Sequence, residues 1–137
     1  MKGKCICEEV TFDVELENHK ISACHCSICR KQTSGIIMTM NIKPGTLKFI
    51  MSESLSIYKS SSWGERGFCK TCGTNLFWRT QDHSYCNINV FSLELEKIEN
   101  NIEFTQELFI DKKPNFYSFC NETKKLTEAE IIELWNS

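Results

Sequence analysis

Seven of the nine cysteines in this 137-residue chain lie in three short clusters, and clustered thiols can bind a metal ion. The clusters are C-x-C (Cys5, Cys7), C-x-C-x-x-C (Cys24, Cys26, Cys29) and C-x-x-C (Cys69, Cys72). Zinc holds thiolates at about 2.3 Å, so its ligands must converge, and these spacings bring neighbouring sulfurs together in a strand or tight turn. Gly73 follows the last cluster at once and lets the backbone leave such a turn. Three clusters in one chain therefore predict zinc, whereas one C-x-x-C alone would be weak evidence.

The number of clustered thiols suggests how they divide between ions. A structural zinc normally takes four protein ligands, and a catalytic zinc takes three and keeps one position open. The trio of Cys24, Cys26 and Cys29 can reach one ion unaided, and the two remaining pairs can close a second. We therefore predict two zinc ions, one catalytic on the trio and one structural on the four-cysteine site formed by Cys5, Cys7, Cys69 and Cys72. Other groupings remain open, as do a purely structural role for all seven, with an unseen fourth ligand at the trio, and a disulfide framework.

Charged side chains accompany two of the clusters. Arg30 and Lys31 follow Cys29 directly, and Arg66 lies just ahead of the last cluster. Positive charge lowers the pKa of a nearby thiol and can also receive a substrate carboxylate, so all three are candidate substrate-binding residues; the alternative is that they are simply solvated. His25 lies between two expected ligands, and alternation in an extended segment turns it away from the metal. We expect it beside the site or on the surface, and not as a ligand.

The other isolated residues are expected to be structural. Cys86 lies in an apolar segment that suits a small buried side chain, and Cys120 is likewise expected in the core. His19 and His83 have no cluster around them and are expected on the surface. Four aromatic residues near the last cluster are expected in the core, although one or two of them can instead wall a substrate pocket: Trp63, Phe68, Phe77 and Trp78.

Short strands account for most of the expected secondary structure. Alternating runs with β-branched and aromatic residues cover 10–14, 36–42, 47–51, 55–59, 75–79 and 85–91, and a further run covers 104–110. Thr127 and Glu130 have the spacing of a capping box and predict a short helix that carries Ile131, Ile132, Leu134 and Trp135. With no repeat or linker, residues 1–137 are expected to form one small, mostly β, zinc-stabilised domain with a C-terminal helix.

Composition limits the partners and the location. Hydrophobic residues make up 41% and charged residues 25%, and the formal charge is −2, so no basic excess indicates nucleic acid as a partner. The first ten residues lack the apolar stretch of a signal peptide, and no window approaches the ~20 apolar residues of a membrane span. We therefore predict a cytoplasmic protein with no membrane attachment. Disulfides are rare in the cytoplasm. No feature of the sequence indicates an oligomeric state.

The cysteine clusters, in this order, resemble those of the glutathione-dependent formaldehyde-activating enzyme family, which includes centromere protein V. The resemblance spans about residues 3–110, and its matching segments are Gly3 to Cys7 with Val10 and Phe12, Cys24 to Lys31 with Gly35, Tyr58 to Ser61, and Arg66 to Leu76. It implies a β-rich fold related to methionine sulfoxide reductase B, a structural zinc on the four-cysteine site and a catalytic zinc on the trio. Glu8 stands where the family usually has glycine, which affects the local turn more than the ligands.

The resemblance also implies an activity. In this family formaldehyde condenses with glutathione to S-(hydroxymethyl)glutathione, a reaction classed under carbon–sulfur lyases, and a small thiol such as glutathione is the expected partner. The open position at the trio can bind the thiol, or zinc can polarise the aldehyde oxygen. Two alternatives differ in class: a non-enzymatic zinc module that binds a protein, as centromere protein V suggests, and a thiol reductase. For the latter, Ser84 to Asn87 resembles the catalytic cysteine segment of methionine sulfoxide reductase B, with Cys86 as nucleophile.

Overall fold

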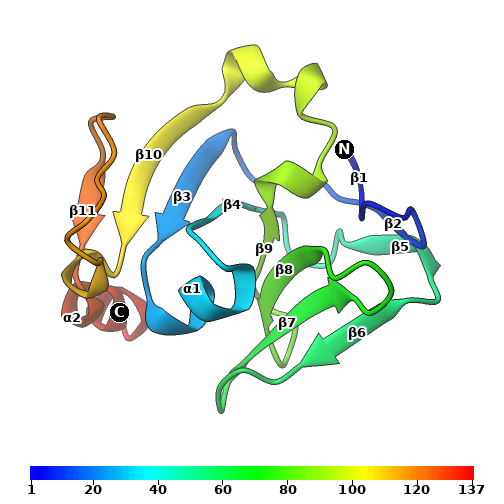
Figure 1. Cartoon of the computed structure of the whole chain (residues 1–137), viewed down its shortest axis with the longest axis horizontal. Coiled ribbons are helices and arrows are strands. Elements are labelled where there is room, and N and C mark those ends of the chain that lie inside the picture. The colour runs from blue at the N-terminus through cyan, green and yellow to red at the C-terminus, as the bar shows by residue number, and fades with distance from the viewer.

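Eleven short strands and two α-helices make up the computed structural model, which describes residues 1–137 (Figure 1). Eight strands form one mixed sheet in the order β11-β10-β3-β4-β9-β8-β7-β6, and β1, β2 and β5 form a small antiparallel sheet. The strands are β1 (Lys2–Lys4), β2 (Val10–Asp13), β3 (Lys20–Cys24), β4 (Ile37–Asn41), β5 (Lys48–Ser52), β6 (Leu55–Tyr58), β7 (Gly64–Cys69), β8 (Asn75–Thr80), β9 (Cys86–Asn89), β10 (Glu103–Leu108) and β11 (Lys124–Leu126). The predicted mostly β fold is thus confirmed.

Both helices are short, and only one of them was predicted. The helix α2 (Glu128–Trp135) begins at the predicted capping box, in which the Thr127 hydroxyl accepts from the Glu130 amide at 3.3 Å and the Glu130 carboxylate accepts from the Thr127 amide at 3.0 Å. The helix α1 (Ser27–Thr33) was not predicted, and Cys26, which keeps the extended conformation expected around His25, caps it. No helix in the structure has the length and apolar character needed to cross a membrane.

All seven predicted strands are present, with ends shifted by at most two residues. For the run at 85–91, β9 ends at Asn89 and Val90–Ser92 form a 3-10 turn. The strands β1, β3, β7 and β11 were not predicted. In β7 the sequence Gly-Glu-Arg-Gly-Phe-Cys has no β-branched residue, yet antiparallel pairing with β6 and β8 on its two sides holds it as a strand.

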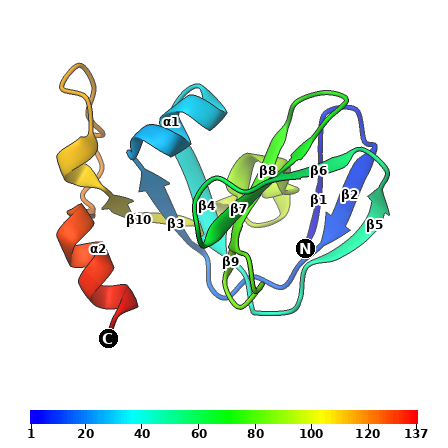
Figure 2. The same cartoon turned by 90° about the horizontal axis from the view of Figure 1, so that it is seen from below.

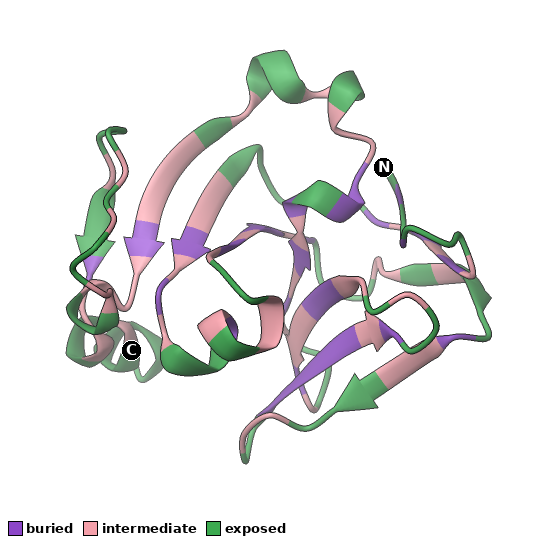
Figure 3. Ribbon diagram, viewed as in Figure 1, coloured by how far each residue is buried: buried purple, intermediate pink, exposed green.

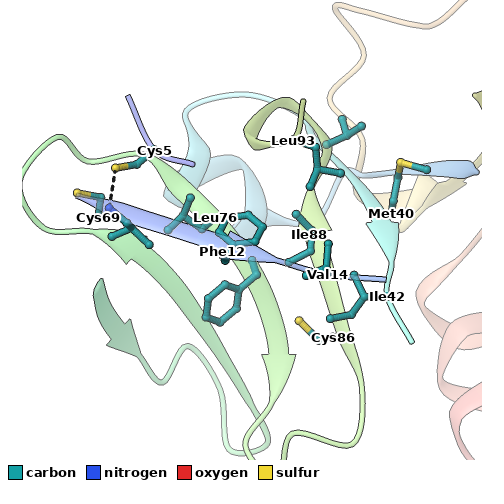
Figure 4. Close-up of a cluster of buried hydrophobic side chains, with 13 residues drawn as sticks. Cys5, Phe12, Val14, Met40, Ile42, Cys69, Leu76, Cys86, Ile88 and Leu93 are labelled. Atoms are coloured by element: carbon teal, nitrogen blue, oxygen red, sulfur yellow. Dashed lines mark hydrogen bonds between the residues drawn. The ribbon is translucent and has the colours of Figure 1, made fainter. Parts of the chain in front are cut away.

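The main core lies between the small sheet and the β4-β9-β8 part of the large one. This core is one cluster of buried side chains, and five completely buried members come from four strands: Phe12 (β2), Met40 (β4), Leu76 and Phe77 (β8) and Ile88 (β9). Figure 4 shows Phe12 beside Leu76 and Ile88, with Met40 at the far end. Most residues of β7 and every second residue of β9 are buried, whereas α2 has no buried residue (Figure 3). Figure 2 shows α2 beside β10 at one edge of the molecule and the small sheet at the opposite edge.

Gly67 marks the closest packing in this core. A Cβ atom at this position would lie 2.2 Å from Cζ of Phe77, whose ring is fully buried. We expect Gly67→Ala to lower the free energy of unfolding by about 2 kcal/mol, because the ring or the strand must move. Urea denaturation checks this, with Gly35→Ala as the control, since no atom lies within 4 Å of a Cβ there. Equal losses in both variants would show that close packing at Gly67 is not the cause.

Candidate metal centres

The first group of thiols joins the two sheets. Cys5 and Cys7 come from the turn between β1 and β2, Cys69 ends β7, and Cys72 lies in the turn before β8, and their four sulfurs lie within 4.8 Å of one another. The Cys7 sulfur is 3.6 Å from that of Cys5 and 3.7 Å from that of Cys69. Figure 4 shows Cys5 and Cys69 side by side at one end of the core. These four thiols can hold one metal ion, and the ion would tie the N-terminal hairpin to the centre of the chain.

Both turns of the four-cysteine site direct donors at the sulfurs. The amide of Val10 points at the Cys5 sulfur at 3.3 Å, and the amide of Cys72 points at the Cys69 sulfur at 3.5 Å. A hydrogen bond from the Thr74 hydroxyl, 3.2 Å away, is the main reason that the pKa of Cys72 is lowered to about 5. The thiolate is the form that binds metal, and the Thr74 contact favours it at Cys72. At Cys7 the contact with Glu9 lowers the pKa, but desolvation and hydrogen bonds with the neighbouring thiols outweigh it and raise that pKa to about 12.

Two residues with positive φ shape these turns. Gly73 has φ 80°, as its position after the last cluster predicted, and Glu8 has φ 65°. Glu8 therefore holds the left-handed conformation that glycine adopts more easily, and its carboxylate is bonded to Lys4 at 2.6 Å. The departure from glycine at this position is accommodated with Cys5 and Cys7 in place.

The trio gathers at the start of α1. Cys24 ends β3, Cys26 caps the helix and Cys29 lies in its first turn, with all three sulfurs within 4.8 Å of one another. The Cys29 amide points at the Cys26 sulfur at 3.3 Å. Thiol hydrogen bonds from Cys24 and Cys29 hold the pKa of Cys26 well below its usual range, and the helix amide adds to this. No fourth His, Cys, Asp or Glu side chain joins the group, so a metal ion here would have three protein ligands.

Arg66 is the predicted cation that reaches the trio. It is buried on β7, and its Nη2 donates to the Cys29 sulfur at 3.4 Å. The rest of the guanidinium donates to the Ser60 hydroxyl at 3.1 Å and to the Gln32 side chain at 3.3 Å. Asn75 also donates to Gln32, at 2.7 Å, so one polar network fixes the positive charge beside the sulfur.

Arg30 and Lys31 are placed differently. Arg30 donates to the backbone oxygens of His25 at 3.0 Å and Lys112 at 3.5 Å, so its guanidinium braces the turn at the start of α1. Lys31 is exposed on the helix. Contact of either residue with a substrate stays a prediction.

His25 was expected beside the site or on the surface, and it is completely buried. Its ring does turn away from the trio: Nε2 lies 2.8 Å from the Glu107 carboxylate and Nδ1 lies 2.7 Å from the Tyr117 hydroxyl. These partners are 82 and 92 residues away in the sequence. No local spacing could have identified them, because β3 and β10 become neighbours only in the folded sheet.

Comparisons with known proteins identify the family of this chain. Residues 1–112 match the family model described as "Glutathione-dependent formaldehyde-activating enzyme". This chain belongs to that family. A Schizosaccharomyces pombe protein named as an uncharacterized lyase is 35% identical over 135 residues, which cover 96% of this chain and 94% of the yeast protein.

Two further similarities extend the family assignment. A Podospora anserina protein, provisionally named a glutathione-dependent formaldehyde-activating enzyme, is 27% identical over 104 residues, covering 70% of this chain and 47% of that protein. The crystal structure of a Rhodobacter sphaeroides protein superposes with a TM-score of 0.62 at 26% identity, covering 77% of this chain and all of that one. The resemblance inferred from the cysteine clusters is thereby confirmed.

The two unclustered cysteines of this family member differ in their surroundings. Cys86 is buried against the core, as predicted, and burial raises the pKa of its thiol to about 12. It is therefore protonated at neutral pH, which disfavours its use as a nucleophile. The prediction for Cys120 was wrong: this residue is exposed, because it lies in the loop ahead of β11 that runs over the surface.

The aromatic residues around the last cluster are only partly core. Phe77 is fully buried as predicted, Phe68 and Trp78 are half-buried, and Trp63 is 49% exposed. Trp63 instead packs edge-on against Trp78 and against Trp135 of α2, each at 5.1 Å between ring centres. These rings attach the C-terminal helix to β8 and to the loop before β7. His19 and His83 are exposed, as expected.

Proposed function

We propose that this protein is a zinc-dependent carbon–sulfur lyase-type enzyme that joins a small thiol such as glutathione to formaldehyde or a related aldehyde. We further propose a structural zinc on the four-cysteine site and a second zinc on the trio. Family membership supports the reaction class, and the trio supports the place. The observation that carries the proposal is the contact of a buried arginine with one of three convergent thiols, at a group that no fourth protein ligand completes.

The donor chemistry of both groups fits zinc. Soft thiolates suit zinc, four of them close a structural site, and three leave a position for a substrate. When bound at the trio, zinc would supply Lewis acidity and favour the deprotonated form of a thiol at that position. The four-cysteine site would supply no chemistry and would serve only the fold.

Residues of the chain supply the electrostatics of the proposed reaction. Three thiolates on one zinc ion carry a net charge of −1, and a substrate thiolate would make it −2. Arg66 offsets part of this charge because its guanidinium is fixed against Cys29 and is buried away from water. In the overall reaction a carbon–sulfur bond forms, the carbonyl π bond is lost, and the thiol proton ends on the new hydroxyl oxygen.

Metal content and adduct formation test this proposal together. We expect two zinc ions per chain in the wild type and one in Cys26→Ser, because that change removes one of three ligands. We also expect the wild type to accelerate S-(hydroxymethyl)glutathione formation above the uncatalysed rate, and Cys26→Ser to lose this acceleration. Cys86→Ala is the control, because Cys86 lies in the core outside both thiol groups; it should keep both ions and the activity. One zinc in both wild type and Cys26→Ser would refute the division into two sites.

The same experiment separates the alternatives. Two zinc ions without any acceleration would favour a zinc module that binds another protein. Loss of all thiol-reductase activity in Cys86→Ser would support the reductase instead, although the high pKa of Cys86 argues against it. The relation to methionine sulfoxide reductase B, the single-domain organisation of residues 1–137 and the cytoplasmic location stay predictions from the sequence. So does carboxylate binding by Arg30 and Lys31.

A further inference from the structure

Every polar group of His25 is engaged, and this residue links two thiols of the trio. Its backbone amide donates to the Leu108 oxygen at 3.0 Å, and its backbone oxygen accepts from Arg30 at 3.0 Å. Its two ring nitrogens meet the Glu107 carboxylate and the Tyr117 hydroxyl at 2.8 and 2.7 Å. Four bonds thus fix the backbone between Cys24 and Cys26, so that the residue cannot rotate without moving a neighbouring sulfur.

The partners of the His25 ring are themselves anchored. Glu107 is buried on β10, and its second carboxylate oxygen accepts from the Thr123 hydroxyl at 2.5 Å and lies 3.8 Å from Lys125. Burial by itself would raise the pKa of Glu107, but the hydrogen bonds from Thr123 and His25 outweigh it and keep that pKa below its ordinary value. A charged carboxylate held on both oxygens is a rigid acceptor for the imidazole.

These anchors come largely from the last part of the chain. Tyr117 and Thr123 lie beyond residue 112, where the match to the family model ends. The segment 113–126 runs along β10, pairs with it through β11, and packs Phe119 against Phe104 at 4.9 Å between ring centres (Figure 1). It therefore adds an edge strand and a loop that the matched region does not contain.

We propose that His25 is the positioning residue of the trio, and that residues 113–126 form a clamp that holds it through Tyr117 and through Thr123 on Glu107. This inference rests on the proposed metal at the trio. A clamped turn presents Cys24 and Cys26 already converged, so less conformational entropy is lost when a metal binds. Hydrogen-bonded partners behind metal ligands typically contribute 10- to 100-fold to metal affinity, and a clamp acting on the backbone is expected at the lower end of that range.

Metal retention in the full-length protein tests the clamp. In Tyr117→Phe we expect one of the two zinc ions to be lost to a competing chelator about tenfold more readily, while the other is retained as in the wild type. Glu107→Leu should lose it at least as readily, and Glu107→Gln should lie closer to the wild type because its amide oxygen can still accept from the imidazole. Tyr85→Phe is the matched control, since it removes a hydroxyl bonded to Asn41 at 2.5 Å elsewhere in the sheet.

Hydrogen exchange distinguishes failure of the clamp from failure of the metal proposal. In the purified full-length protein, the backbone amides of residues 25–30 should exchange about fivefold faster in Tyr117→Phe than in the wild type or in Tyr85→Phe, because one hydrogen bond of the turn is lost. A wild type with only one metal ion would overturn the proposed function and leave this comparison in force. Unchanged exchange in both Tyr117→Phe and Glu107→Leu would overturn the clamp.

Discussion

Cys7→Ser is expected to lower the free energy of unfolding by at least about 5 kcal/mol, enough to unfold much of the protein at 37 °C. Binding of a structural zinc ion contributes about 10–16 kcal/mol to small domains, whose net stability is about 5–15 kcal/mol. Cys7 is exposed, so serine at this position leaves no cavity and buries no hydroxyl. The loss would come from the metal link between the β1–β2 turn and the end of β7. Urea denaturation monitored by tryptophan fluorescence measures it.

Cys120→Ser provides the matched control, because Cys120 is also exposed and belongs to neither thiol group. Its free energy of unfolding should stay within about 0.5 kcal/mol of the wild-type value. Removal of zinc by a strong chelator should destabilise the wild type and Cys120→Ser alike, and should have little further effect on the stability of Cys7→Ser. If Cys7→Ser and Cys120→Ser unfold at the same urea concentration, the four-cysteine site is not a structural metal site.

The thiol groups were the most predictable part of the molecule, because short spacings determine which sulfurs can converge locally. The pairing of the first cluster with the last also followed from ligand number, and the structure brings those four sulfurs together. The helix α2 was predictable for a similar reason, since a capping box is complete within four residues. Apart from that pairing, which followed from the number of ligands, these features depend on neighbours in the sequence.

Several other features were missed, most of them because they depend on distant contacts. The helix α1 escaped prediction because Cys26 supplies the cap, and cysteine is not among the residues that usually do so. The strand β7 contains two glycines and two charged residues, and only its place between β6 and β8 makes it a strand. The burial of His25 depends on Glu107 and Tyr117, and the exposure of Cys120 depends on how the last loop crosses the surface. Sequence spacing carries no information on either.

The sequence left Arg66 either simply solvated or functional, and as a functional residue it could bind a substrate carboxylate or stabilise thiolates. The structure places its guanidinium 3.4 Å from the Cys29 sulfur and buries it. With Ser60 and Gln32 on its other nitrogens, the charge is directed at the trio. Stabilisation of thiolates therefore has direct geometric support. Stabilisation of thiolates and binding of a substrate carboxylate make different predictions for thiols of different structure.

Arg66→Gln is expected to lower kcat/KM for adduct formation by about 10- to 100-fold, because hydrogen bonds to charged groups contribute about 1.5–3 kcal/mol. The loss should be the same with glutathione and with 2-mercaptoethanol, since Arg66 acts on the sulfur and both substrates supply one. Arg66→Lys should recover only part of the rate, because a lysine keeps the charge and lacks the fork that reaches Cys29, Ser60 and Gln32 together.

Arg79→Gln is the control for this variant, because Arg79 lies on the adjacent strand β8 and is bonded to Glu65 at 2.8 Å instead of to a thiol. Its stability should fall, while kcat/KM per folded molecule should stay near the wild-type value. A loss in Arg66→Gln confined to glutathione would assign the arginine to a carboxylate of the substrate. A comparable loss with both thiols would instead place its charge on the sulfur centre, where the contact with Cys29 already locates it.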